Sequence, residues 1–348
     1  MGHGIERIIE SGAEVDCFGY VGARAWHGLG QKVGERGDPA VTLPQVEHAA
    51  RADWNVVTDD VNTRSTGQEI GGVQALMRER DMRVLGFTTD RYAVIQHREL
   101  GKLLDVLVAS GKATWESCGV LDDGRRIFYS ARLVTRIEAV SGDETELFAV
   151  ATTSHDGSAT ATLLLSSVRV VCQNTLTLAM SRNVDSVRVR HTGGAGDALA
   201  RARDVVLDVD GRIASIDAAM NMLARITLTE RQAQRFLDLV NPVPALPSVE
   251  VFVSFTEERQ KRLLYAQDLA MRVQAKIKEL HESHIGQDVA RRGSGYAWVQ
   301  ASTAYATHVM RSAGKVESLL VGDAAKLGRR AFTVLTEAET RADVLAAA

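Results

Sequence analysis

The pattern of apolar and polar residues divides the chain into a strand-rich first half and a helical second half. Short runs rich in valine, isoleucine, threonine and aromatic residues, bounded by turn residues, are typical of strands. Such runs occupy Trp54 to Thr63, Arg83 to Gln96 (two stretches around Asp90-Arg91) and Val187 to His191. The glycine-rich N-terminus before them predicts a loop.

Three successive hairpins are predicted in the middle of the first half. Each contains two strand-like runs separated by a turn with glycine, which tolerates the positive φ of tight turns. The turns are Asp123-Gly124, between Cys118–Leu121 and Arg126–Val134; Ser141–Asp143, between Ile137 and Leu147–Val150; and His155–Ser158, before Thr160–Val171. Successive hairpins form an antiparallel meander. We therefore predict an α+β fold with a β-meander in the N-terminal half and long helices in the C-terminal half.

Helical spacing of apolar residues predicts short helices beside the strands. Leu43 to Ala52 follows Thr42, a residue that starts helices, and Leu100 to Ala109 forms a helix packed on the sheet. A further short helix is predicted over Asn174 to Met180. The glycines between Thr192 and Gly196 then interrupt the chain. We place a domain boundary there, between a sheet domain over residues 1–192 and a helical domain over residues 193–348.

Two long apolar stripes in the second half follow the three-and-four spacing of a coiled-coil seam. One runs from Leu199 to Leu223 and includes Ile213 and Ile216, and the other runs from Leu263 to Leu280. Three prolines between Asn241 and Pro247 separate them. The stripes are typical of two antiparallel helices packed on each other within one subunit, and also of a seam between subunits. Two further helices are predicted over Ala297–Arg311 and Asp323–Leu335.

Composition restricts the classes of partner. The 348 residues carry a net charge of −3, so any nucleic-acid contact needs a local basic patch. Three scattered cysteines do not make a disulfide framework or a CxxC metal site, as is typical of the cytoplasm. No signal peptide or membrane-spanning run is visible, so we expect a cytoplasmic protein without membrane contact. No motif for a cofactor is present, and we expect none.

Residues with catalytic or metal-binding chemistry are few. His155 and Asp156 are able to ligate a divalent cation, but neighbouring strand residues point to opposite faces and aspartate is common in turns. His281 and His284 lie three apart on a helix without the His-Glu-x-x-His pattern of hydrolytic zinc sites. Cys172 precedes the short predicted helix, and no histidine is placed by the sequence to serve as its base. We therefore name no catalytic residue and no metal ligand.

Arginines with nearby aromatic residues are the best candidates for a binding site. Arginine and exposed aromatic side chains on a sheet hold single strands, by neutralising phosphates and stacking bases. Arg188 and Arg190 share one side of their predicted strand, and further arginines (Arg125, Arg126, Arg132, Arg136) cluster on the central hairpin. The candidate nucleic-acid-binding residues are Arg125, Arg126, Tyr129, Tyr92, Arg169, Arg188, Arg190 and His191. The same pattern is also typical of an ordinary solvated sheet face.

Several short motifs follow one another in a fixed order along the chain. They include Trp26–Gly30, Leu85–Phe87, Thr153–Ser158, Arg169–Leu176, Arg190–Thr192, Ala297-Trp298 and Leu319–Leu327. In this order they resemble the phage/plasmid-like family built on the domain of unknown function 932, over nearly the whole chain. The sequence departs from the usual Thr-Ala-Trp at Tyr296–Trp298. The resemblance implies a phage, prophage or plasmid gene and carries no established activity. Its architecture is similar to that of ring-forming single-strand annealing proteins.

Three functional hypotheses follow. The first is a non-enzymatic phage protein that binds single-stranded nucleic acid as a homo-oligomer, as an annealing or recombination accessory protein. The second is a metal-dependent nuclease or hydrolase centred on the His155-Asp156 turn. The third is a non-catalytic assembly component that works through the heptad helices.

Overall fold

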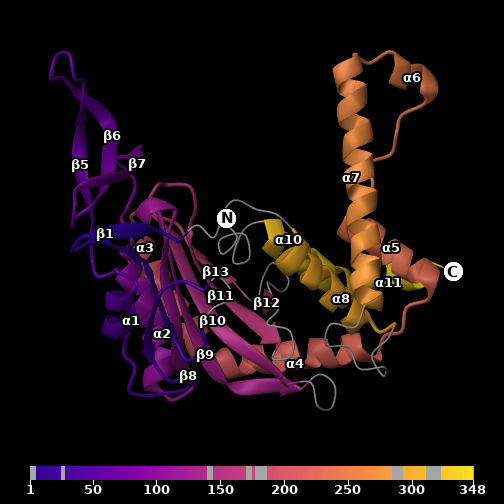
Figure 1. The fold of residues 1–348 in the computed structure, drawn as a ribbon, viewed down its shortest axis with the longest axis horizontal. Helices are drawn as coiled ribbons and strands as arrows, with labels where there is room; N and C mark the ends of the chain where they lie inside the picture. The colour runs from indigo at the N-terminus through magenta and orange to yellow at the C-terminus, as the bar shows by residue number, and fades with distance from the viewer. Residues whose placement is uncertain are drawn as a thin grey trace.

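A computed structural model describes residues 5–24, 28–138, 144–169, 175–176, 186–283, 293–310 and 323–347. It confirms the predicted α+β class: strands dominate the first half and helices the second. Two slender arms, one of strands and one helical, project in the same direction from opposite ends of the body (Figure 1).

The main sheet of the described residues has eight strands and contains the predicted meander. In order along the chain these are β3 (Phe18–Val21), β4 (Gln31–Gly34), β8 (Ala113–Leu121), β9 (Arg126–Glu138), β10 (Glu144–Ser154), β11 (Ala161–Arg169), β12 (Thr175–Leu176) and β13 (Ser186–Val189). Their order in the sheet is β12-β11-β10-β9-β8-β3-β4, and β13 also pairs with β11. The strands β8 to β11 are antiparallel neighbours, which confirms the hairpins around Asp123-Gly124 and His155–Ser158. The turn Ser141–Asp143 lies outside the described residues.

Two local predictions are wrong because tertiary pairing overrides local preference. The N-terminus is not a loop, since β1 (Arg7–Glu10) and β2 (Ala13–Asp16) form a hairpin and β3 joins the main sheet. Thr175–Leu176 is not helical: these residues pair with β11 as β12, and their neighbours lie outside the described residues.

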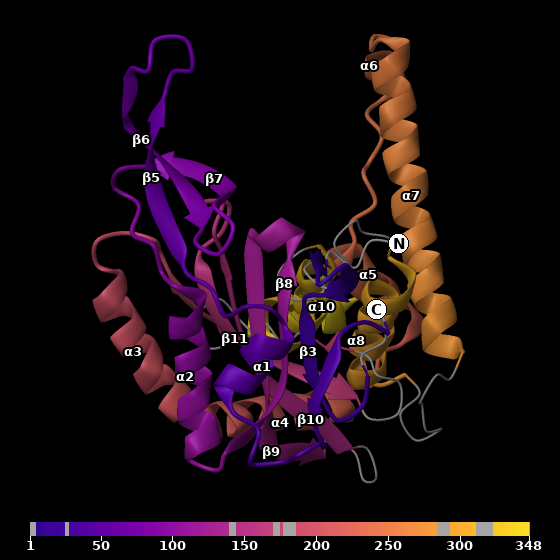
Figure 2. The same cartoon turned by 60° about the vertical axis from the view of Figure 1, so that its left-hand side comes forward.

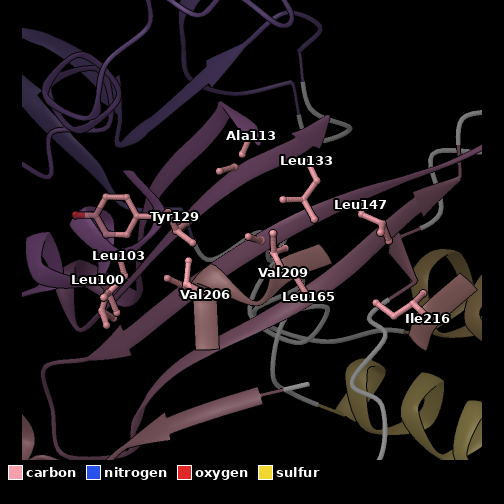
Figure 3. Close-up of a cluster of buried hydrophobic side chains, with 14 of the residues drawn as sticks. Leu100, Leu103, Ala113, Tyr129, Leu133, Leu147, Leu165, Val206, Val209 and Ile216 are labelled. Carbon is pink, nitrogen blue, oxygen red and sulfur yellow. The ribbon is translucent and has the colours of Figure 1, made fainter. Parts of the chain in front are cut away.

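One face of the main sheet, which we call the helix face, packs against α1 (Leu43–Ala49) and α2 (His97–Ala109). Thr42 caps α1 in a capping box with Gln45, as expected of a threonine at a helix start. α3 (Ala195–Leu207) packs on α2 and β13 (Figure 2). Figure 3 shows the core beneath these helices, where Leu103, Leu133 and Val206 come from three separate elements. Burial of these apolar side chains is the main force that holds helices on sheet.

The opposite side of the sheet, which we call the far face, carries its own apolar cluster. Its members come from β3, β8, β9, β10 and β11 and are Phe18, Tyr20, Leu121, Phe128, Phe148, Val150 and Leu164, together with Ile5. Phe18 and Phe128 contact each other, with ring centroids 6.1 Å apart. Even-numbered residues of β9 therefore point to the far face, while Ile127, Tyr129 and Ala131 point to the helix face.

The strand arm is a separate three-stranded sheet of β5 (Val56–Asn62), β6 (Glu69–Arg78) and β7 (Arg83–Thr89). Its base is fixed by Arg78, whose guanidinium is 1% exposed and lies 2.9 Å from the carboxylate of Glu6. Asp81 accepts further hydrogen bonds from Arg78, which also lies over the ring of Trp54. The arm is thus tied to the N-terminal segment by a buried ion pair.

The first apolar stripe belongs to two helices, because the chain breaks at Asp208 between α3 and α4 (Val209–Arg225). Ile213 and Ile216 are buried at 6% and 0% exposure. α4 packs mainly on α8 (Gly295–Ala304), α10 (Asp323–Thr336) and β9, whereas α7 (Glu257–Glu282) packs mainly on α8 and the π-helical turn η3 (Tyr305–Val309). The predicted antiparallel pairing of the two stripes is therefore not their main contact. Both predicted C-terminal helices are present, as α8 with η3 and as α10.

The rest of the helical half includes elements that were not predicted. These are α5 (Glu230–Val240), α6 (Val249–Val253) and α11 (Ala338–Ala346). α7 extends far beyond the body, with α6 at its tip, and forms the helical arm (Figure 1, Figure 2). The proline segment returns along α7, where Gln267 donates to the carbonyl of Pro244 and Asn241 donates to that of Ala270. Among the described helices, none is long and apolar enough to cross a membrane.

Candidate nucleic-acid interface

Strand register places the predicted arginines at one end of the main sheet. Thr152 of β10 pairs with Phe128 of β9 and with Thr162 of β11, and Thr162 pairs with Arg188 of β13. Because residues paired in this way share a face, Arg188 projects from the same face as Phe128. β9 begins and β13 ends at this end of the sheet. We call its predicted arginines, Arg125, Arg126, Arg188 and Arg190, the basic end.

Three of these four guanidinium groups are open to solvent. Arg125, Arg188 and Arg190 are exposed, and none of them has an ion pair with any residue that the structure describes. Arg126 is half-buried and donates to the hydroxyl of Ser158 (3.1 Å). Burial raises the pKa of Asp156, but hydrogen bonds from Ser158 and the charge of Arg126 lower it by more. The negative charge of Asp156 thus partly balances that of Arg126, whereas the guanidinium groups of Arg125, Arg188 and Arg190 are available to an anion.

The other arginines of the central hairpin have carboxylate partners within the protein. Arg132 lies 3.6 Å from carboxylate oxygens of both Glu116 and Glu146, and Arg136 lies 3.9 Å from Glu146. Arg36 also pairs with Glu146, which is only 3% exposed. Burial raises the pKa of Glu116 to about 7, against the opposing charges of Arg132 and Arg36. Arg132, Arg136 and Arg36 are therefore engaged with carboxylates, unlike the three exposed arginines of the basic end.

The prediction that Tyr129 stacks on a base is wrong. Its ring points to the helix face and is fully buried, in contact with the ring of Trp115 at 6.4 Å between centroids. Its hydroxyl donates to the carboxylate of Glu47 (2.9 Å), which also accepts from Arg98. An odd-numbered residue of β9 cannot share a face with Arg126.

His191 and Tyr92 form a stacked pair next to the basic end. Their rings are nearly parallel, with centroids 4.6 Å apart, and the hydroxyl of Tyr92 donates to the carbonyl of Ser154. His191 is 7% exposed, and its Nδ1 donates to the carbonyl of Ala93 while its Nε2 accepts from Thr153. Burial lowers the pKa of His191. His191 is thus almost entirely covered by the protein, and Tyr92 is partly buried against the core.

Two further arginines, Arg169 and Arg329, lie on β11 and α10. Arg169 ends β11, opposite Thr145, and its side chain lies outside the described residues. Arg329 of α10 was not singled out by the sequence, and the charge of Arg188 acts on it. Arg329 is half-buried, and both its burial and the charge of Arg188 lower its pKa. No sequence pattern signals this interaction, because Arg329 comes from another half of the chain.

His155 is a buried partner of His97, and its ring does not face Asp156 as a shared metal site requires. Nε2 of His97 donates to the carbonyl of Ala52 (2.8 Å), so its Nδ1 accepts from Nε2 of His155 (3.2 Å). Trp54 packs against both imidazoles. Asp156 turns away and accepts from the backbone N–H of Ser158.

No group of three or more potential ligands is placed to hold a metal ion within the described ranges. The remaining residues considered from the sequence, His281, His284 and Cys172, add no metal site to the described ranges. His281 stacks on Trp298 with centroids 3.9 Å apart, whereas His284 and Cys172 lie outside the described residues.

The buried imidazoles make folding stability depend on pH. Burial lowers the pKa of His97 from 6.5 to about 4 and that of His155 well below its usual value. The unfolded chain therefore takes up protons first, and stability is complete above pH 6.5 and lost as the pH falls from about 6.5 towards 4. For His97 alone the loss reaches about 3 kcal/mol at pH 4.

Urea unfolding midpoints between pH 7.5 and 5 measure this loss. The variant His97→Gln is expected to show a smaller fall over the same range, whatever its stability at pH 7.5. An equal fall in both proteins would assign the acid sensitivity to other groups.

Comparison with known proteins gives one match. A family model described as domain of unknown function (DUF932) matches residues 84–343, a range that begins in β7 and ends in α11. The comparisons with curated proteins and with solved structures found no match.

Proposed function

The chain belongs to the family of the domain of unknown function 932, and from the geometry of its basic end we propose that it binds single-stranded nucleic acid. One observation carries the proposal: Arg125, Arg188 and Arg190 are exposed at the same end of the sheet and have no ion pair within the described part of the chain. Unpaired guanidinium groups are good phosphate ligands, because they donate several hydrogen bonds in a fixed geometry.

The proposed strand follows the end of the sheet and does not cross its middle. Phe128, Thr152 and Thr162, which lie between Arg126 and Arg188 on the far face, are at most 8% exposed. Three interstrand steps of about 4.8 Å separate β9 from β13, so the arginines extend over about 14 Å. Contact with several phosphates and few bases predicts binding with little sequence preference. We propose that the chain is a phage or prophage protein that acts in annealing or recombination of single strands.

Salt dependence of binding tests this function. Fluorescence anisotropy of a labelled single-stranded oligonucleotide is measured with the full chain between 20 and about 300 mM salt. We expect binding at low salt and a linear fall of the logarithm of affinity with the logarithm of salt concentration, because each phosphate contact releases counterions. Absence of binding at the lowest salt concentration would refute the proposal.

Self-association is a second proposed property, supported by the apolar side chains that both arms expose. On the strand arm, register places Phe87 beside Ala75, and Phe87 is 61% exposed. At the tip of the helical arm, Val249 and Val253 are 75% and 65% exposed. Grouped apolar side chains on a surface mark contact sites. The arms, and not the buried heptad stripes, are therefore the proposed contact with a second copy.

The double substitution Val249→Ser and Val253→Ser tests this contact. Molar mass by light scattering is expected to shift from an oligomer towards a monomer, because the apolar contact is lost. Val134→Ser, also an exposed valine, is the control on the body of the molecule. A mass that is unchanged in the arm variant, or monomeric in the wild type, would contradict the role of the arm.

The hydrolase hypothesis centred on His155 and Asp156 has less support, because the two side chains diverge. Elemental analysis of the purified protein tests it directly. Bound zinc or manganese in stoichiometric amount, lost in His155→Ala, would favour it over the binding function.

A further inference from the structure

Most of the large apolar side chains that the described residues expose are on the two arms. Of seventeen such side chains, five lie on the strand arm and seven on the helical arm. The arms project from opposite ends of the body and stay apart in both views (Figure 1, Figure 2). One arm therefore does not cover the apolar side chains of the other within one chain, and their burial needs a second molecule.

The open face of the strand arm combines apolar side chains with a negative charge. Ala75 of β6 pairs with Phe87 of β7 and with Asp59 of β5, so these three side chains share one face. Val73, two residues before Ala75, points the same way. Phe87 and Val73 are 61% and 37% exposed. Asp59 is exposed and has no ion pair with any residue that the structure describes.

The tip of the helical arm combines apolar side chains with a positive charge. Val249 and Val253 lie about one turn apart on α6 and are 75% and 65% exposed. Gln260 of α7 donates to the carbonyl of Phe255 and so holds the tip on the long helix. The guanidinium of Arg259 lies over the Phe255 ring, 3.7 Å from its centroid. Arg259 is exposed, and it has no ion pair within the described ranges.

The two surfaces complement each other, and neither complements itself. Two strand arms in contact bring two Asp59 carboxylates together, and two helical tips bring two Arg259 guanidinium groups together. Like charges at a contact disfavour both pairings. Contact between unlike arms instead places a guanidinium next to a carboxylate and buries apolar side chains from both copies. A helix on the open face of a sheet is also a common packing arrangement.

We infer that the strand arm of one copy packs against the tip of the helical arm of the next copy, with Asp59 facing Arg259. The contact is head to tail, so each copy uses its two arms for two different neighbours. Such contacts generate a closed ring or an open chain of copies, and not a two-fold dimer. The inference rests on the proposed self-association and deepens it, because it names the surfaces that meet.

Two variants of the full chain, measured alone and mixed, test this arrangement. The strand-arm variant carries Val73→Ser and Phe87→Ser, and the helical-arm variant carries Val249→Ser and Val253→Ser. Light scattering is expected to give the molar mass of a monomer for each variant alone, because a head-to-tail contact needs one arm of each kind. An equal mixture is expected to reach the mass of a dimer and no more, since one intact strand arm then meets one intact helical arm.

Like-with-like contact gives the opposite pattern. Each variant would then keep the contact between its intact arms and remain dimeric on its own, which would overturn the inference. A mixture that stays monomeric would also overturn it.

Charge reversal tests the same contact with the apolar side chains unchanged. Asp59→Arg and Arg259→Asp are each expected to raise the dissociation constant of the assembly about tenfold, because each brings like charges together. The chain with both substitutions is expected to return to within about threefold of the wild type, since the pair is restored with opposite polarity. Asp60→Arg is the control, because Asp60 pairs with Gln74 and so points to the other face of the arm. Additive losses in the double variant would overturn the contact between these two charges.

The same measurements separate failure of this inference from failure of the proposed self-association. A monomeric wild type would reject both. An oligomeric wild type whose two variants stay dimeric on their own would keep self-association and reject the head-to-tail contact. Oligonucleotide binding at the basic end is measured independently of either result.

Discussion

Replacing Arg188 and Arg190 together by glutamine is expected to weaken oligonucleotide binding by about ten- to a hundredfold at low salt. Both side chains are exposed at the basic end and unpaired within the described residues, so their loss removes phosphate contacts without breaking an internal bond. The slope of log affinity against log salt is expected to fall by about 1.4, since each phosphate contact contributes about 0.7 for a single strand.

The matched control removes the same charge elsewhere. Arg201 and Arg203 are exposed on α3, and their replacement by glutamine is expected to leave both the affinity and the salt slope close to those of the wild type. If the two double variants lose affinity equally, binding depends on net charge alone, and the basic end is not the site.

The variant Glu6→Gln is expected to lower the free energy of unfolding by about 3 kcal/mol. Glu6 and Arg78 form an ion pair in which each side chain is 1% exposed, and Glu6 also lies 3.5 Å from Arg83. A neutral amide leaves the buried charge of Arg78 with Asp81 as its remaining carboxylate partner. The loss of one member of a buried pair costs more than the pair contributes, because the other charge stays desolvated.

Urea unfolding at pH 7 measures this effect. Glu14→Gln is the control: Glu14 pairs with Arg7 at the surface, and its loss is expected to cost less than about 1 kcal/mol. Equal costs for both variants would show that the strand arm is not fixed through Glu6. Limited proteolysis of the arm in Glu6→Gln would then locate its actual attachment.

The strand arm and the basic end are in contact with each other. Gly86 of β7 packs so closely on Asp156 that a side chain at this position has no room, and Asp156 follows β10 at the basic end. The strand arm therefore contacts the turn that begins at Asp156. A loosened arm is expected to disturb the turn that carries Ser158, the partner of Arg126.

Local patterns in the sequence determined most of the elements. Alternating apolar residues and turn residues predict the hairpins of β8 to β11, and Thr42 predicts the start of α1. These signals can be recognised locally because they act over a few residues. The face shared by Arg188 and Arg190 also follows from the two-residue period of a strand. The family assignment agrees with motifs that extend along much of the chain.

Only the tertiary structure decided which faces meet and which charges remain free. The sequence shows that Tyr129 and Arg126 lie on opposite sides of β9, but not which side the helices cover. It does not show that Glu146 pairs with Arg132, or that the two heptad stripes have different partners. These contacts join residues far apart in the chain, and their energies depend on burial and geometry that no local pattern contains.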